Sequence, residues 1–371
     1  MNIHRSIRHR LTKLEDLLRK PLVKNASVFT GNGDQRPPAA EKRPRQTAFI
    51  SLKDARKKRF YHNYREDSVE IIPQLLGVKV FEDFDLNILR QYIDWTPFFH
   101  GWGLKGKFPG ILEKEKVGRE ANRVFNEGQE MLEEIIEKKM FTPQGIIGIF
   151  PANSEGDDIL IYTSDKRKRV RRRIPMLRQQ QLRDQEGFTL SLSDYIAPAD
   201  TGIRDYLGGF AVTSGFETDR LVRHFKSQGD SYNSVMVRLL ADRLVEAFAE
   251  VLHEAVRKKY WGYDPGEKLS QTDLIKERYK GIRPAPGYPA CPDHTLKGHL
   301  FDLMKVERRT GITLNDSYAM NPASSVAGFY MAHDRSRYFG IGKIGEDQLR
   351  DYARRASIDP GEAEKWLAPV L

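Results

Sequence analysis

The chain has 371 residues, of which 39% are hydrophobic, and it carries a formal net charge of +10. A chain of this length can bury one large core or two modest ones. Its single cysteine, Cys291, excludes an internal disulfide framework, and no run approaches the roughly eighteen apolar residues of a membrane span. We therefore expect a cytoplasmic protein with no membrane partner.

The excess positive charge is confined to the N-terminal part of the chain. Residues 1–67 hold 17 basic residues (Lys and Arg) against 7 acidic residues (Asp and Glu). The remainder of the chain holds 44 basic and 44 acidic residues. This part contains GNGDQRPPAAEKRPRQ, a mixture of Gly, Pro and charge typical of linkers. We interpret residues 1–43 as a basic linker or tail, with a short basic helix over 3–20, and residues 44–371 as one folded domain. Contact of the tail with RNA or an acidic protein stays open as an alternative, although no nucleic-acid partner is expected.

Hydrophobic patterning after Ser68 predicts short strands and amphipathic helices. Asp85 is placed to cap a helix that leads to Asp94. Further helices are expected over residues 114–139, 232–260, 294–308, 345–356 and 359–369, and strands over 145–153, 158–163, 187–198, 205–215, 318–333 and 336–344. Because the strands succeed one another without regular intervening helices, we expect an α+β fold with a mainly antiparallel sheet and flanking helices.

A dense basic run, KRKRVRRR, occupies residues 166–173. On an edge strand such a run usually opposes edge-to-edge aggregation. A docking face for an acidic redox partner is the alternative interpretation, and the sequence leaves both open.

The stretch GIRPAPGYPACPDH, residues 281–294, is rich in proline and glycine. Proline locks φ and lacks a backbone donor, so this stretch can be neither a helix nor an interior strand. A stiff loop holds its amides and carbonyls in place with little entropy left to lose, as a site for a small polar ligand requires. A rigid turn that only connects two helices is the alternative.

Six separated motifs resemble, in the same order, the C-terminal activation domain of cobalamin-dependent methionine synthase. They are DWTPFF (Asp94–Phe99), FPAN (Phe150–Asn153), ADRLVEAFAEVLHE (Ala241–Glu254), YWGY (Tyr260–Tyr263), RPAPGYPACPDH (Arg283–His294) and EKWLAP (Glu364–Pro369). The resemblance extends from about Glu41 to the C-terminus. It implies a bent, mainly antiparallel sheet in a C-shaped domain, preceded over 1–43 by a possible remnant of the cobalamin module.

The resemblance also implies an activity and its partners. The family binds S-adenosylmethionine and serves reductive reactivation, in which a methyl group passes to reduced cobalamin held on a partner domain or subunit. Flavodoxin or a similar donor supplies the electron. A chain with this domain alone is not expected to make methionine. The alternative is a non-catalytic S-adenosylmethionine-binding or corrinoid-docking subunit of another corrinoid methyltransferase.

The resemblance assigns ligand contacts residue by residue. Arg283 suits the carboxylate of S-adenosylmethionine, because a guanidinium fork meets a carboxylate bidentately. Asp94 suits the α-ammonium group; a carboxylate bonded only to nearby amides is its alternative role. The backbone around Ala285 is expected to meet the adenine.

Further residues follow from the same motifs. Tyr338 and Phe339 are expected to line the ligand, and Tyr288 belongs to the same cofactor-binding set. Tyr288 and His294 would also lie near the docked corrinoid, with no catalytic residue assigned with certainty. Glu246 lies two positions from the apolar stripe of the helix over 232–260, so it can point into the site or face solvent.

Two patterns in the C-terminal third carry no cofactor prediction. Gly340, Gly342 and Gly345 spell GxGxxG, but the 26 residues that follow read as helices, not as the remaining strands of a dinucleotide fold. Cys291 and His294 have the spacing of half a zinc site, without a second cysteine to complete it. No metal site is expected, and DxHxxG, the cobalamin-binding signature, is absent.

Overall fold

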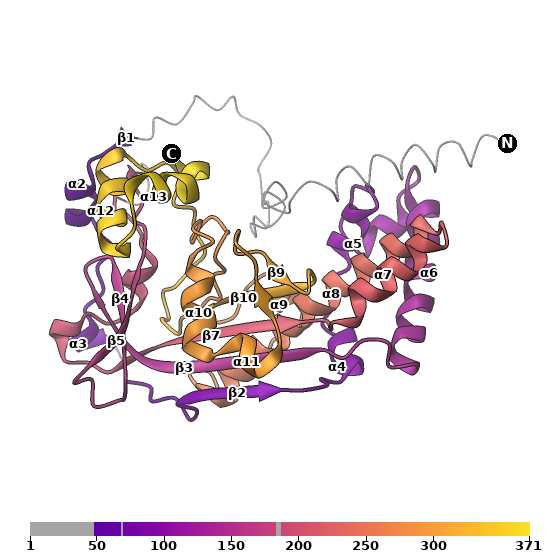
Figure 1. Cartoon of the computed structure of the whole chain (residues 1–371), viewed down its shortest axis with the longest axis horizontal. Helices are drawn as coiled ribbons and strands as arrows, with labels where there is room; N and C mark the ends of the chain where they lie inside the picture. The colour runs from indigo at the N-terminus through magenta and orange to yellow at the C-terminus, as the bar shows by residue number, and fades with distance from the viewer. Residues whose placement is uncertain (1–47, 68–69, 183–186) are drawn as a thin grey trace.

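A long antiparallel sheet crosses the molecule and carries helices at both of its ends (Figure 1). The computed structural model describes residues 48–67, 70–182 and 187–371. The basic helix expected over 3–20 and the tail over 1–43 lie outside these residues. In Figure 1 the helices at both ends rise on the same side of the long strands, which gives the domain the expected C shape.

The main sheet has the order β10-β7-β3-β4-β5, with β2 also paired to β3, and its strand pairs are antiparallel. Its strands are β2 (Gly77–Phe81), β3 (Gln144–Glu155), β4 (Asp158–Tyr162), β5 (Val170–Pro175), β7 (Asp205–Thr213) and β10 (Ser325–Tyr330). Two short pairs lie apart from it: β1 (Ala48–Phe49) with β6 (Gln181–Leu182), and β8 (Thr313–Leu314) with β9 (Met320–Asn321). The predicted α+β fold is confirmed.

The sheet changes partners in the middle of β3. Residues Gly145–Ile149 pair with β2, whereas Ala152–Glu155 pair with β4 on the same side of the strand. Pro151 lies between these two stretches, opposite Tyr206 of β7, and β7 pairs with β3 without interruption from Gln144 to Ala152.

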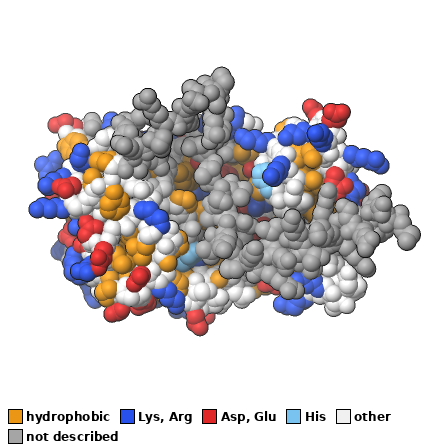
Figure 2. Space-filling model, turned by 90° about the horizontal axis from the view of Figure 1, so that it is seen from above, with side chains coloured by type: hydrophobic (Ala, Val, Ile, Leu, Met, Phe, Trp, Pro, Cys, Tyr) orange, Lys and Arg blue, Asp and Glu red, His pale blue; other side chains and the backbone are white. Residues whose placement is uncertain are grey.

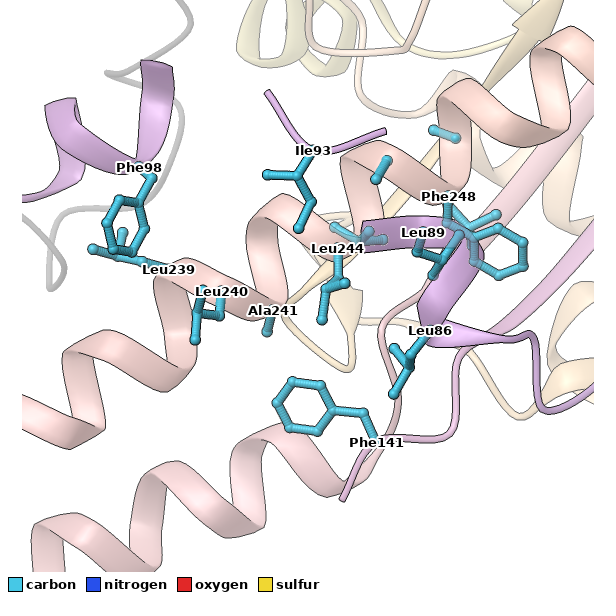
Figure 3. Packing of buried hydrophobic residues seen from close by; sticks show 14 of the residues in the cluster. Leu86, Leu89, Ile93, Phe98, Phe141, Leu239, Leu240, Ala241, Leu244 and Phe248 are labelled. Atoms are coloured by element: carbon cyan, nitrogen blue, oxygen red, sulfur yellow. The ribbon is translucent and has the colours of Figure 1, made fainter. Parts of the chain in front are cut away.

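Helix α8 (Ser231–Ala255) is the central core helix, and it continues as the π-helical turn η5 (Val256–Tyr260). The side chain of Asp230 caps its N-terminus by accepting from the amide of Asn233. Figure 3 shows Leu244 and Phe248 of α8 facing Leu86 and Leu89 of the capped helix α4 (Leu86–Arg90). The predicted helix over 232–260 is thus confirmed, with a π-type last turn of the kind often found at functional sites.

The other helices surround this core. They are α2 (Leu52–Lys57), α3 (Tyr64–Asp67), α5 (Thr96–Gly101), α6 (Gly118–Glu137), α7 (Glu217–Ser227), α9 (Gln271–Ile275), α10 (Leu296–Met304), α11 (Val306–Thr310), α12 (Glu346–Ala356) and α13 (Pro360–Leu367), with short 3-10 turns η2 (Gly110–Glu113), η3 (Leu192–Tyr195), η4 (Ala199–Thr201) and η6 (Ala368–Val370). None of the helices in the described ranges is long and apolar enough to cross a membrane.

Two strand predictions are wrong. Residues 187–198 form isolated bridges and the turn η3, because Ser191 and Asp194 make a capping box that satisfies the local amides. Residues 336–344 form an irregular segment before α12. Both segments carry apolar side chains that pack without ladder positions. Those of 187–198 fill a second core with β4 and β10, whereas Ile341 and Ile344 pack in a third cluster with α12 and α13.

The basic run over 166–173 ends in the edge strand β5, and several of its arginines bind within the molecule. Arg172 pairs with Asp302, and Arg173 pairs with Asp158 at 2.8 Å and with Glu155 at 2.5 Å. On the part of the surface that Figure 2 shows, Lys and Arg are interspersed with Asp and Glu. The internal pairs favour a structural role for this run.

Asp351 on α12 joins the N-terminal and C-terminal parts of the domain. It accepts from Arg56 at 2.6 Å and from Arg355 at 2.7 Å. Burial alone would raise its pKa, but these arginines and Arg354 lower the pKa from the ordinary 3.8 to about 2. Since the folded-state pKa lies below the unfolded one, this carboxylate stabilises the fold above about pH 4, and that contribution is lost as pH falls towards 2.

We therefore expect Asp351→Asn to lower the free energy of unfolding at pH 6, and the difference from wild type to shrink as pH falls from 4 to 2. Urea unfolding at several pH values measures this difference. A difference that stays constant over the whole pH range contradicts the assignment.

Candidate functional site

The proline-rich loop is held against the edge of the main sheet. Ile282 and Met331 exchange two backbone hydrogen bonds of 3.0 Å, and the amide of Phe329 donates to the carbonyl of Pro284 at 2.8 Å. Arg283 therefore lies on a short extension of the sheet beside β10. This extension fixes the direction in which its side chain leaves the backbone.

After this extension the chain turns tightly. The amide of Gly287 donates to the carbonyl of Cys291 at 2.7 Å, and the amide of Tyr288 donates to the carbonyl of Ala285 at 3.1 Å. Gly287 has φ +100°, and a Cβ placed there would lie 2.2 Å from Cε1 of His294. Only glycine fits, because the backbone conformation and the imidazole both exclude a side chain.

We expect Gly287→Ala to displace the His294 ring or the loop and to weaken ligand binding at this site. A strained φ costs on the order of 1–3 kcal/mol, so a loss in binding of about 5- to 140-fold is expected. Gly266→Ala is the matched control, since a Cβ there meets nothing within 4 Å. Calorimetric titration with S-adenosylmethionine measures the effect, and equal affinities for the two variants would contradict it.

Arg283 forms a partly buried ion pair with helix α8. Its Nη2 lies 2.9 Å from Oε2 of Glu250, and the two side chains are 20% and 11% exposed. Burial alone would lower the pKa of Arg283, but Glu250 and the neighbouring tyrosines raise this pKa well above its ordinary value. Nη1 of Arg283 is buried and has no hydrogen-bond partner among the described residues. The guanidinium therefore keeps donor capacity for an additional acceptor.

A second arginine supports the same carboxylate. Arg257, in η5, lies 3.7 Å from Oε1 of Glu250 and makes a bidentate pair of 2.5 and 2.8 Å with Glu267. Its guanidinium also lies 4.4 Å from the centroid of the Tyr279 ring. Glu250 therefore faces two arginines, and together with Glu267 it balances their two positive charges.

Tyr338 fixes the backbone from which Arg283 projects. The Arg283 amide donates to the Tyr338 hydroxyl at 3.0 Å, and this hydroxyl lies 3.2 Å from that of Tyr279. Phe339 is half-buried, with its ring 6.3 Å from that of Tyr195. The structure thus brings Tyr338 directly to Arg283, while Phe339 packs on the adjoining core.

Tyr288 and Glu246 lie on the exposed side of this cluster. Tyr288 is 37% exposed, and the carboxylate of Glu246, together with burial, raises its pKa. Glu246, half-buried on α8, also acts to raise the pKa of Arg283. The inward direction of its side chain stays a prediction.

Asp94 lies at the start of α5, where its Oδ1 accepts from the amide of Thr96 at 2.9 Å. The turn is anchored to α8, since Tyr92 donates to Glu254 at 2.7 Å. Glu254 and Glu250 are four residues apart, which is about one helical turn. Tyr92, two residues before Asp94, and Arg283 therefore contact neighbouring turns of α8. Within the described ranges Arg283 pairs with Glu250 and not with Asp94.

Sequence patterns did not reveal the supporting residues Glu250, Arg257, Glu267 and Tyr279. One signal was present: Glu246, Glu250 and Glu254 recur every four residues on a mostly apolar helix, and Arg257 follows about one turn later. Carboxylates in this spacing share one face, so an inward Glu246 predicts an inward Glu250.

The fold and the site define a class: a bent α+β domain whose proline-rich loop holds a buried arginine with an unused donor. A family model described as the activation domain of vitamin B12 dependent methionine synthase matches residues 85–357. The chain therefore belongs to this family, which confirms the resemblance read from the motifs. It is also similar to the crystal structure of the MetH reactivation domain bound to AdoHcy, with 47% sequence identity, a TM-score of 0.85, and coverage of 88% of this chain and 99% of that chain.

Proposed function

We propose that this chain binds S-adenosylmethionine at Arg283 and supports the reductive reactivation of cobalamin-dependent methionine synthase. The observation that carries this proposal is the buried, unpartnered Nη1 of Arg283. A buried N–H without a partner is unfavourable by about 1–3 kcal/mol, and a ligand carboxylate would relieve that cost. The solved relative with AdoHcy bound, at 47% identity, supports a ligand of this kind.

Each site residue has a role within this proposal. Arg283 binds the carboxylate, and Glu250 and Tyr338 hold Arg283 in place. Asp94 receives the α-ammonium group through the oxygen that the Thr96 amide does not use. The backbone at Ala285 and the rings of Tyr338 and Phe339 line the rest of the ligand. These roles explain why the proline-rich loop with Arg283 and the turn with Asp94 before α5 are both fixed to α8.

The chemistry requires alignment more than acid or base assistance. Bound S-adenosylmethionine would supply an already activated methyl group, and reduced cobalamin on a partner domain or subunit would receive it. The residues of this chain hold the donor in one orientation, so that the reaction benefits from proximity. Tyr288 and His294 border the proposed docking face for the cobalamin module, and a flavodoxin-like protein is the proposed electron donor.

The decisive test combines this chain with a cobalamin-loaded partner module, a one-electron reductant and S-adenosylmethionine. We expect the absorbance spectrum of methylcobalamin to appear, and to depend on S-adenosylmethionine. Binding without methylcobalamin formation would favour the alternative, a non-catalytic corrinoid-docking subunit. Absence of binding would contradict both.

A further inference from the structure

Two histidines and an aspartate meet at a point outside the proposed S-adenosylmethionine contacts. His62 lies just before α3, and His333 and Asp334 follow β10. One potential ligand atom from each residue lies within 4.8 Å of the others. Side chains separated by more than 250 positions in the sequence (His62 to His333) are thus brought to one point by the fold.

The cluster is enclosed by aromatic rings on one side and open on the other. The imidazoles of His62 and His333 have ring centroids 4.5 Å apart, and Tyr64 and Tyr195 pack on His333 at 5.4 and 5.6 Å. The His333 side chain is 4% exposed, whereas that of Asp334 is 67% exposed. An ion could therefore enter past the carboxylate and reach buried nitrogen donors.

His333 shows an unmet bonding requirement. Its Nδ1 accepts from the amide of Arg335 at 3.0 Å, while Nε2 is buried and has no hydrogen-bond partner in the described part of the chain. A buried ring nitrogen without a partner requires an explanation, and a bound metal ion is one.

We propose that His62, His333 and Asp334 bind a divalent transition-metal ion of the zinc type. Two imidazole nitrogens and one carboxylate oxygen suit Zn²⁺ or Co²⁺, whereas Mg²⁺ and Ca²⁺ prefer oxygen ligands alone. Coordination through Nε2 of His333 requires the ring proton on Nδ1, so the bond that Nδ1 accepts from the Arg335 amide would have to open in the metal-bound state.

The ion would join two distant segments of the chain. One segment leads into α3, and the other continues from His333 to Tyr338, the residue that holds the Arg283 backbone. The proposed role is therefore a structural brace beside the ligand site. The inference does not depend on the proposed function.

The test uses the full chain without a histidine tag, stripped with a chelator and titrated with Co²⁺. We expect one equivalent of Co²⁺ to bind and to give visible d–d absorption bands. Zn²⁺ should displace the bound Co²⁺ and raise the melting temperature of the metal-free protein. His62→Gln and His333→Gln should each abolish stoichiometric binding. His224→Gln, which changes an exposed histidine on α7, is the matched control and should leave binding unchanged.

Asp334→Asn keeps the experiment decisive if the buried histidine variants fail to fold, because its side chain is exposed. This variant is expected to weaken Co²⁺ binding about 10- to 100-fold. Two results overturn the proposal: no stoichiometric Co²⁺ binding by the wild type, or binding of unchanged affinity in Asp334→Asn. In either case the histidines are only a packed ring pair.

Discussion

Replacing Arg283 by alanine is expected to weaken the binding of S-adenosylmethionine by about 30- to 1000-fold. Removing one partner of a buried charge pair costs about 2–4 kcal/mol, which corresponds to that range of dissociation constants. The physical reason is twofold: the ligand carboxylate loses its cation, and Glu250 loses the partner at 2.9 Å. Isothermal titration calorimetry on wild type and variant measures the change.

Two controls separate recognition from general damage. Arg309→Ala removes an exposed arginine on α11 and should leave the affinity unchanged. Glu250→Gln keeps the Arg283 charge but removes its carboxylate partner, so we expect a smaller loss than for Arg283→Ala. If the Arg283→Ala variant folds, as judged by circular dichroism, and binds S-adenosylmethionine as tightly as wild type, then Arg283 does not bind the ligand.

The second large effect concerns stability. Arg178 is 1% exposed and lies at the centre of a buried ion cluster, with a bidentate pair to Asp194 at 2.6 and 2.8 Å and a bond to Asp157 at 2.7 Å. Arg178→Met is expected to lower the free energy of unfolding by about 3–5 kcal/mol, because it leaves Asp194 buried without its cation. Urea unfolding monitored by circular dichroism measures this loss.

The matched control for this prediction is Arg169→Met, which changes an exposed arginine in the basic run. The double variant Arg178→Met, Asp194→Leu should recover part of the loss, since apolar replacements of both partners leave no unpaired charge. A loss for Arg178→Met no larger than that of the control would show that the cluster contributes little to stability.

Sequence patterns predicted the elements whose periodicity is long and consistent. The helix over 232–260 and the strands over 145–153, 158–163 and 205–215 all have a regular apolar pattern that tertiary packing reinforces. Residues 187–198 were misassigned because Ser191 and Asp194 bond to nearby amides, and such local bonds compete with strand pairing. Residues 336–344 have apolar side chains without a paired neighbour to make them a strand.

The sequence predicted only those residues of the candidate site that the family resemblance assigns. Arg283 and Tyr338 were named from the sequence, and the structure joins them by a hydrogen bond of 3.0 Å. Glu250 and Arg257 were not named, because their role depends on which face of α8 meets the loop, and a sequence pattern does not fix that contact. The pair formed by His62 and His333 was not predicted either, because the two residues are far apart in the sequence and only the fold brings them together.

The central claim is that the guanidinium of Arg283 binds the amino-acid end of S-adenosylmethionine. A crystal structure of the chain with S-adenosylhomocysteine tests it most directly, by the distance from Nη1 of Arg283 to the ligand carboxylate. We predict a charge-assisted hydrogen bond of about 2.7–2.9 Å, with Asp94 beside the ligand's ammonium group. A ligand bound elsewhere, with Nη1 still unpartnered, would contradict the account.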